Sequence, residues 1–237
     1  MPDSELCFLN ALNNEEQPPT ELNWNSKGYV TPPRYQGDDC NTCFIFSTVA
    51  AAESAWYRFK GKPTGEKFSE QAILNCMYEG KPAIEDPCRD AKGGLPSLVL
   101  EHMMEHGLTL AENEPYVNKT GHCENYPVAA KPVSYCRGDN VDDESLKRQL
   151  FRNGPLIIRI DINNLGNVCA GQSYKGPCPK ESFHSVLLVG YDEEFWYFKN
   201  SWGDDWADKG FFKMSRDSKL CEECSIYSEF EVPLFKM

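Results

Sequence analysis

The sequence lacks several features that would define a class of protein at once. None of its apolar runs approaches the ~18 residues that a membrane-spanning helix needs, which excludes an integral membrane protein. Basic residues are scarce, with 24 Lys and Arg against 36 Asp and Glu, and the formal net charge is −12. Because so anionic a surface repels phosphate backbones, nucleic-acid binding is not expected. The N-terminus has neither the basic patch nor the apolar stretch of a signal peptide.

Cysteine, in contrast, is abundant. The chain has eleven cysteines among 237 residues, although a chain of this length can fold without disulfides. This count indicates an oxidising compartment, so we expect a secreted or lysosomal/vacuolar protein. Because the number is odd, one thiol is left over as an intermolecular link or a reactive group. Since no leader is visible, we interpret the sequence as a processed or recombinant form.

Hydrophobic periodicity divides the chain into a helical half and a β half. Apolar residues at three- and four-residue steps predict a helix from Cys43 to Phe59, with a stop at Gly61. Further helices are predicted over 69–77, 96–107 and 142–153. Apolar runs bounded by Gly, Asp and Asn predict strands over 156–162, 185–191, 195–200 and 210–214. We therefore expect an α+β protein of two subdomains with a cleft between them.

Three polar residues occupy the ends of these predicted elements. Cys43 begins the strongest helix, whose N-terminus carries unpaired N–H groups and a partial positive charge that favour a thiolate. His184 begins an apolar strand, and Asn200 ends another. A thiolate nucleophile, an imidazole that carries protons and an amide that orients the imidazole form a triad for acyl transfer. The sequence therefore predicts nucleophilic catalysis by Cys43.

Other motifs allow a metal or redox interpretation. C-x-x-C pairs occur at 40–43 and 221–224, but zinc sites with four cysteines usually place their pairs closer together. His102 and His106 have the spacing of one zinc-peptidase motif on a predicted helix. No third ligand is identifiable, however, and the helix ends at Gly107, so we favour a solvated helix face. We expect no metal and no cofactor.

Six short blocks carry a family resemblance. They are Gln-Gly…Cys-x-x-Cys-[aromatic]-x-Phe-Ser at 36–47, Ser-Glu-Gln at 69–71, Gly-Gly-x-Pro at 93–96, Gly-Pro at 154–155, His184 before Val-Leu-Leu-Val-Gly-Tyr, and Asn-Ser-Trp-Gly-x-x-Trp at 200–206. In this order the blocks resemble the papain family of cysteine peptidases, which includes the cathepsins. The resemblance covers residues 21–237 and implies a papain-like fold, with a helical subdomain at about 25–128 and a β-rich subdomain at about 129–237.

The sequence departs from the family pattern in four places. Asn41-Thr42 replaces the usual Gly-Ser, Phe44 replaces the usual Trp, and Ala207 stands where Gly is usual. One extra acidic residue lies between Gly37 and Cys40. None of these departures removes a catalytic group, although the loss of Trp mildly favours an alternative, a catalytically weak homologue that binds peptides or inhibitors or has a structural role.

The resemblance implies a mechanism and a set of partners. The Cys43 thiolate, paired with protonated His184, would attack a peptide carbonyl, while the Cys43 N–H and the Gln36 amide stabilise the oxyanion. Asn200 would hold the imidazole in plane, and Trp202 would shield that contact.

Peptide or protein substrates, an inhibitory propeptide and cystatin-type inhibitors are the implied partners of a monomer. Residues 1–20 would be an N-terminal extension or a propeptide remnant. Without the paired-histidine occluding loop of cathepsin B, an endopeptidase is expected.

The resemblance also implies substrate-binding residues. These are Gly93, Gly94, Leu95, Pro96, Arg159, Ser182, Phe183, Trp202 and Glu229. Glu229 falls at the floor of the pocket that selects the residue two places before the scissile bond, and Arg159 falls on its wall. A cation and a carboxylate that share a partly buried cavity are expected to pair. Alternatively, Arg159 points away from this pocket or lies outside it.

Disulfide pairs follow from the same resemblance. Cys40–Cys88, Cys76–Cys123 and Cys178–Cys224 match the family's bridges. Cys169–Cys221 is expected because the neighbours of both residues are already joined, and Cys7–Cys136 then remains. Independently of the family, Asn118 begins an Asn-Lys-Thr acceptor for N-glycosylation.

Overall fold

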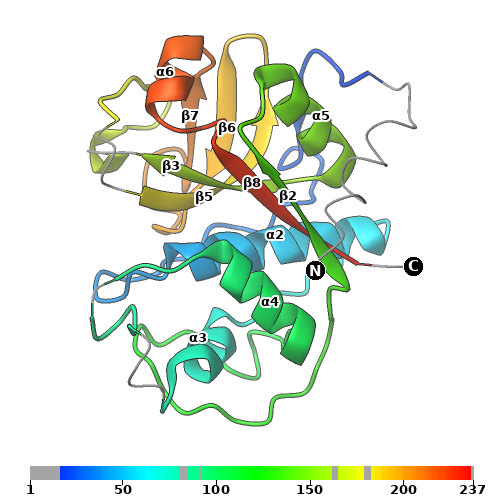
Figure 1. Ribbon diagram of the computed structural model, residues 1–237, viewed down its shortest axis with the longest axis vertical. Helices are drawn as coiled ribbons and strands as arrows, with labels where there is room; N and C mark the ends of the chain where they lie inside the picture. Colours follow the sequence, from blue (N-terminus) through cyan, green and yellow to red (C-terminus); the bar gives the residue numbers. More distant parts are fainter. Residues whose placement is uncertain (1–16, 81–84, 91, 162–164, 179–182, 236–237) are drawn as a thin grey trace.

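The computed structural model describes residues 17–80, 85–90, 92–161, 165–178 and 183–235. Its helices are α2 (Cys43–Phe59), α3 (Glu70–Tyr78), α4 (Pro96–His106), α5 (Asp143–Asn153) and α6 (Ser218–Glu223), with a 3-10 turn at Leu165–Asn167. In Figure 1, α2, α3 and α4 form the lower part of the molecule, below a sheet that α5 and α6 flank. None of these helices is long and apolar enough to cross a membrane within the ranges just given.

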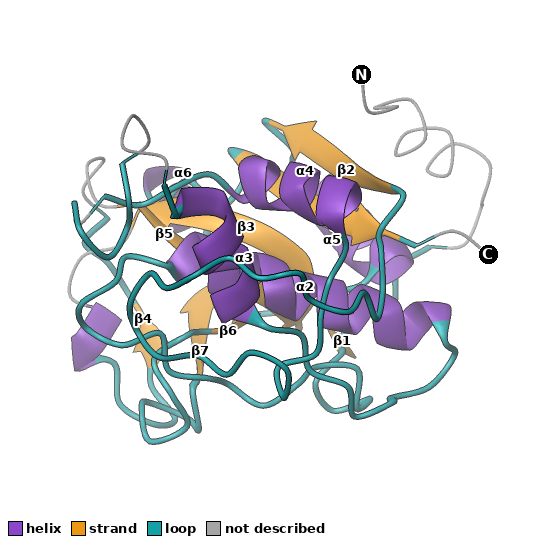
Figure 2. Ribbon diagram, turned by 90° about the horizontal axis from the view of Figure 1, so that it is seen from below, coloured by secondary structure: helices purple, strands orange, loops and turns teal. Residues whose placement is uncertain are grey.

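Helix α2 is the central element of the fold. Its residues Ile45, Val49, Ala51 and Ala52 are fully buried, because the helix is apolar on nearly all sides. It packs against β5 and β8 of the sheet on one side and against α3 and α4 on the other. Seen from below, α3 lies in front of α2, and α4 lies to one side of it (Figure 2). The helix has the predicted bounds, and its start lies at the junction between the helices and the sheet.

The other predicted helices are confirmed with small shifts at their ends. Ser69 and Asp142, predicted as the first helical residues, are instead N-caps of α3 and α5. The Ser69 side chain accepts a hydrogen bond from the N–H of Ala72, and Asp142 accepts one from the N–H of Ser145. Side-chain capping of this kind satisfies N–H groups that have no partner within the helix.

A single mixed sheet forms the upper part of the molecule. Its strands are β1 (Leu22–Asn23), β2 (Ser134–Asp139), β3 (Leu156–Asp161), β4 (Ser173–Tyr174), β5 (Phe183–Tyr191), β6 (Phe195–Lys199), β7 (Phe211–Ser215) and β8 (Glu229–Leu234). The order is β2-β8-β3-β5-β6-β7-β4, antiparallel except for β4 beside β7, and β1 pairs with β5. The predicted strands correspond to β3, β5, β6 and β7, whereas β1, β2, β4, β8 and α6 were not predicted.

A buried ionic cluster joins the helices to the sheet. Glu53 of α2 accepts hydrogen bonds from Arg34 at 2.7 Å and from Thr31 at 2.5 Å. The ammonium of Lys199, the last residue of β6, donates to Thr31 at 2.9 Å. Arg34 also pairs with Glu70 of α3 at 2.8 Å. Burial lowers the pKa of Lys199 to about 8 and raises the pKa of Glu70 to about 7. The cluster thus ties α2, α3 and β6 together next to Asn200.

Glu53→Ala is expected to destabilise the protein strongly, because it leaves Arg34, Thr31 and the Phe68 N–H without their common acceptor. Breaking a buried charge pair costs about 3–5 kcal/mol. Equilibrium urea unfolding measures the change. Glu144→Ala, which removes an exposed carboxylate from α5, is the control and should cost less than about 1 kcal/mol. Equal losses in both variants would contradict a structural role for the cluster.

Candidate active site

The candidate site lies where the start of α2 meets strand β5. Cys43 is the first residue of α2, and His184 is the second residue of β5. Asn200 directly follows β6, the antiparallel neighbour of β5. The fold therefore brings together the three residues that the sequence predicts, with the nucleophile on a helix and its partners on the sheet.

The charges of Cys43 and His184 depend on each other. Burial alone raises the pKa of the Cys43 thiol, but its hydrogen bond and charge interaction with His184, together with backbone hydrogen bonds at Ser185 and Phe44, lower the net pKa below the ordinary 9.0. Burial lowers the pKa of His184, but Cys43 and Asn200 raise the net value above the ordinary 6.5. Opposite shifts of this kind favour a thiolate beside an imidazolium.

Asn200 fixes the orientation of the imidazole. Its Oδ1 lies 2.7 Å from Nε2 of His184 and accepts a hydrogen bond from the Ser201 N–H at 2.8 Å. Because the Ser201 N–H can only donate, the atom facing His184 is the amide oxygen, and Nε2 must carry a proton. The other ring nitrogen is left for Cys43. The Trp202 ring lies 5.1 Å from the imidazole, and Trp206 packs edge-on against Trp202.

Gln36 is fixed beside this triad by a residue that was not predicted. Its N–H donates to the Ser201 carbonyl at 2.8 Å, and the Ser201 hydroxyl donates to Oε1 of Gln36 at 2.6 Å. These contacts direct Nε2 of Gln36 toward the Cys40 carbonyl, 3.3 Å away. Ser201 follows Asn200 directly in the sequence, so it could have been included from its position alone.

A cleft of about 350 Å³ runs past the thiol. It is lined by Cys43, Gly93, Gly94, Leu95, Arg159, Phe183, His184 and Ser185. Gly94 must lack a side chain here, because a Cβ would lie 2.6 Å from the ring of Phe44. Pro96 begins α4 and is buried outside this lining, and Ser182 lies outside the described residues. Ser185 was not predicted, and its hydroxyl lies 2.8 Å from that of Ser47 on α2.

Arg159 points into the cleft, and Glu229 is behind it. The Arg159 guanidinium pairs with Glu229 at 2.8 Å and lies over the Phe183 ring at 4.8 Å. A second cation that was not predicted, Arg137 of β2, also pairs with Glu229, at 3.0 Å. Next to them, burial and the charge of Glu229 raise the pKa of Glu231 to about 7. The carboxylate expected at the pocket floor is therefore held by two arginines.

The cysteines are only partly as predicted. The structure contains the bridges Cys40–Cys88, Cys76–Cys123 and Cys178–Cys224. The predicted Cys169–Cys221 bridge is wrong, because both thiols are free. Cys221 is buried, with its Sγ 3.5 Å from the Ser215 carbonyl, whereas Cys169 is exposed.

Two further cysteine predictions concern the Cys7–Cys136 bridge and the two C-x-x-C pairs. Cys7 lies outside the described residues, so Cys7–Cys136 stays a prediction, although Cys136 is disulfide-bonded. Cys40 and Cys224 are each bridged to a distant cysteine, so neither C-x-x-C pair is available as a zinc or redox pair.

The two helical histidines lie away from this cleft. The His102 and His106 rings are 4.6 Å apart on α4 and line a separate cavity of about 320 Å³. Across the described ranges, no group of three or more His, Cys, Asp or Glu residues is placed to hold a metal ion.

A half-buried thiol with a lowered pKa, beside an imidazole that an amide holds in place, can perform thiol-dependent acyl transfer. Residues 18–234 match the papain family of cysteine proteases. A viral cathepsin of Cydia pomonella granulosis virus is 33% identical over 229 residues, covering 94% of this chain and 66% of that protein. The chain belongs to the papain family of cysteine proteases.

Solved structures show the same fold. Procathepsin L2 proteinase from the larval midgut of Tenebrio molitor superposes with a TM-score of 0.83 at 28% identity, over 95% of this chain and 71% of that chain. The bromelain protease of Ananas comosus, solved in complex with the inhibitor E64, superposes with a TM-score of 0.79 at 27% identity. The match covers 92% of this chain and 100% of that chain. The chain spans 61% to 66% of the length of three curated relatives it matches.

The raised pKa of Glu231 predicts that the free energy of unfolding depends on pH. Its pKa is about 7 when folded and about 4.5 when unfolded, so its stabilising contribution is complete below pH 4.5 and is lost as pH rises through 7. Relative to Glu231→Gln, the free energy of unfolding of the native sequence should fall by about 3 kcal/mol between pH 4 and pH 8. Urea unfolding across this range measures it. The exposed Glu223→Gln is the control, and a pH-independent difference for Glu231→Gln would show that the carboxyl is not perturbed.

Proposed function

We propose that the protein is a papain-like cysteine endopeptidase that hydrolyses peptide bonds through a thioester acyl-enzyme. The observation that carries the proposal is the meeting of Cys43, at the start of α2, with His184 of β5, whose imidazole Asn200 holds at 2.7 Å. The opposite pKa shifts of Cys43 and His184 agree with a nucleophilic thiolate and a proton donor at the same pH. The cleft beside Cys43 and His184 gives a substrate access to this pair. It is lined by residues from the start of α2, the loop before α4, and the strands β3 and β5.

The reaction follows from these positions. The Cys43 thiolate attacks the scissile carbonyl carbon, and the carbonyl electron pair moves onto oxygen. The Cys43 N–H and Nε2 of Gln36 donate to this oxyanion. As the carbon–nitrogen bond breaks, His184 protonates the departing amine and the thioester remains. His184 then takes a proton from water, the hydroxide attacks the thioester, and the Cys43 thiolate leaves. Asn200 keeps the imidazole in plane through both steps.

The rival interpretation is a catalytically weak homologue that binds peptides or inhibitors. It rests mainly on Phe44, which stands where Trp is usual in the family. Phe44 is buried and packs on Gly94 at the cleft wall, so the replacement keeps an aromatic ring in this place. A protein that only binds has no need of the hydrogen bond between His184 and Asn200, and this favours the enzyme.

Endopeptidase action requires a cleft that is open at both ends. The first described residues run along the far end of β5, where Leu22 pairs with Tyr191 and the Pro19 carbonyl accepts from the Tyr191 hydroxyl. His184 lies at the opposite end of this strand. No residue of 17–24 is part of the cleft lining. Within the described chain, the N-terminal segment therefore leads away from the substrate.

The same proposal includes partners and a compartment. We expect peptide or protein substrates, inhibition by a propeptide or a cystatin-type protein, and a monomer. The Tenebrio molitor relative was solved as a procathepsin, which supports inhibition by a propeptide, and the Ananas comosus relative was solved in complex with the inhibitor E64. Three disulfides support a secreted or lysosomal/vacuolar location.

Internally quenched peptides that are blocked at both ends should be cleaved, because an endopeptidase needs no free terminus. An irreversible thiol-directed epoxide should label Cys43 and abolish cleavage, and Cys43→Ala should show neither labelling nor activity. Fluorescence release and peptide mapping measure the two effects. Cys169→Ala, which removes an exposed free thiol, is the control and should keep both. Cleavage of free-ended dipeptide substrates alone would exclude the endopeptidase, and labelling without any cleavage would favour the binding homologue.

Charge at the subsite determines the residue accepted two places before the scissile bond. Glu229 alone would attract an arginine side chain, but Arg159 lies between it and the cleft and neutralises it. The planar guanidinium of Arg159, which lies over the Phe183 ring, also narrows this pocket. We therefore expect medium apolar or polar residues at this subsite.

Arg159→Ala should raise kcat/KM for arginine relative to leucine at this position by about fivefold, because an exposed ion pair is worth about 1 kcal/mol. A fluorogenic substrate library measures the ratio. Arg137→Ala removes the outer arginine of the same carboxylate but leaves Arg159 in the cleft, so it should not gain arginine acceptance. Strong arginine preference in the native enzyme would contradict the pairing.

A further inference from the structure

The two oxyanion donors are connected by one short loop. Gln36 begins this oxyanion loop, residues 36–42, and Cys43 directly follows it at the start of α2. The two N–H donors must keep a fixed separation to act on one oxygen, since oxyanion stabilisation depends on preorganised donors. Ser201 holds Gln36 from one side, and the Asn41 N–H donates to the Pro87 carbonyl at 3.0 Å. A further segment, residues 116–120, contacts the loop from the other side.

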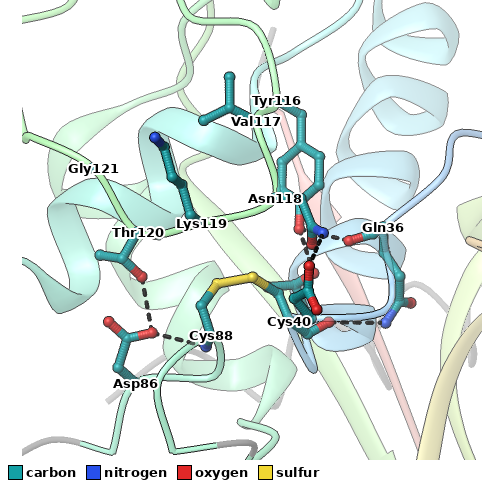
Figure 3. The surroundings of a disulfide bond; sticks show 12 residues. Gln36, Cys40, Asp86, Cys88, Tyr116, Val117, Asn118, Lys119, Thr120 and Gly121 are labelled. Atoms are coloured by element: carbon teal, nitrogen blue, oxygen red, sulfur yellow. Dashed lines mark hydrogen bonds between the residues drawn. A yellow bond between two sulfur atoms is a disulfide. The ribbon is translucent and has the colours of Figure 1, made fainter.

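The Tyr116 hydroxyl joins the two ends of the oxyanion loop. It donates to the backbone carbonyl of Gln36 at 2.7 Å (Figure 3). It also lies 3.1 Å from the Thr42 hydroxyl. Because its one proton is used on Gln36, Thr42 must be the donor in the second contact. The ring packs edge-on against Phe46, 4.8 Å away on α2. Burial raises the pKa of Tyr116 to about 12, so the hydroxyl stays protonated.

Asn118 holds the middle of the loop. Its Nδ2 donates to Asp39 at 3.2 Å. Its amide lies directly on Gly37, where a Cβ would be 2.2 Å from the Asn118 side chain, and Gly37 has a φ of +81° that favours glycine. Figure 3 shows Asn118 turned toward the Gln36–Cys40 backbone, while the intervening Val117 points away from it.

The far end of the loop is tied to the same segment. Asp86 accepts hydrogen bonds from the Thr120 hydroxyl and from the Cys88 N–H, both at 2.8 Å. Cys88 is bridged to Cys40, the fifth residue of the loop. Residues 116–120 therefore contact the oxyanion loop directly through Tyr116 and Asn118, and they are connected to Cys40 indirectly through Asp86 and Cys88.

We propose that Tyr116 and Asn118 are positioning residues of the oxyanion hole, which hold Gln36 in a fixed relation to the start of α2. The proposal rests on the proposed function. It also bears on the glycosylation motif, because Asn118 is the acceptor and a glycan would be attached to the same Nδ2 that donates to Asp39.

Tyr116→Phe tests the proposal by removing one oxygen atom. Removing a whole oxyanion donor costs about 10²–10³ in kcat, so a misplaced one should cost on the order of tenfold in kcat with KM little changed. The affinity for a peptide aldehyde, whose adduct with Cys43 carries the oxyanion, should fall in parallel. The rate of Cys43 alkylation by iodoacetamide should not change, because the thiolate depends on His184.

Tyr57→Phe is the matched control. It removes a hydroxyl that also donates to a backbone carbonyl, that of Glu66 at 2.8 Å, but about 21 Å along α2 from Cys43. Both variants should lose similar thermal stability, and only Tyr116→Phe should lose turnover and aldehyde affinity. Asn118→Ala should follow Tyr116→Phe, and Val117→Ala should match the native enzyme.

Unchanged aldehyde affinity and kcat in Tyr116→Phe and Asn118→Ala would overturn the proposal. An equal loss of alkylation rate would also overturn it, since the effect would then lie on the thiolate. Aldehyde binding does not require turnover, so it tests the positioning even if the native protein fails to cleave peptides. That failure would contradict only the proposed function.

Discussion

The hydrogen bond between Cys43 and His184 is the interaction on which the rest of the structure depends, because its partners come from the two halves of the molecule. Cys43 is held by α2, the helix that packs against both the sheet and the other helices, and His184 by a strand at the centre of the sheet. Any relative movement of α2 and β5 would separate the two groups. The Ser47–Ser185 hydroxyl contact and the Glu53 cluster resist that movement directly behind the site.

A single residue near the thiol can hold two groups of the site in place. Ser201 shows this most clearly, since its N–H fixes the Asn200 oxygen while its hydroxyl and carbonyl fix Gln36. One residue thus couples the orientation of the imidazole to the oxyanion donor. On the cleft side, Arg159 and Arg137 share the carboxylate of Glu229, so the contacts there are ion pairs.

The sequence predicted the triad because each of its members marks the end of a strongly periodic element. It did not predict Arg137, since β2 reads Ser-Tyr-Cys-Arg-Gly-Asp and has no apolar alternation. It also missed β8, whose alternation Glu-Phe-Glu-Val is short and is followed within the strand by Pro233, a residue that disfavours strands. Tyr116 lies in a loop, where no periodicity indicates its contacts. The Cys169–Cys221 prediction failed because neighbouring bridges limit where two cysteines lie but not which way their side chains point. Cys221 faces the interior from α6.

The most direct test of the Cys43–His184 pair is the pH dependence of Cys43 alkylation by a small neutral reagent. If the pair exists as thiolate and imidazolium, the rate should remain high well below pH 9.0, the ordinary pKa of a thiol, and His184→Gln should move the titration back toward that value. A native protein whose alkylation rate titrates once, near pH 9, with no change in His184→Gln, would contradict the central claim.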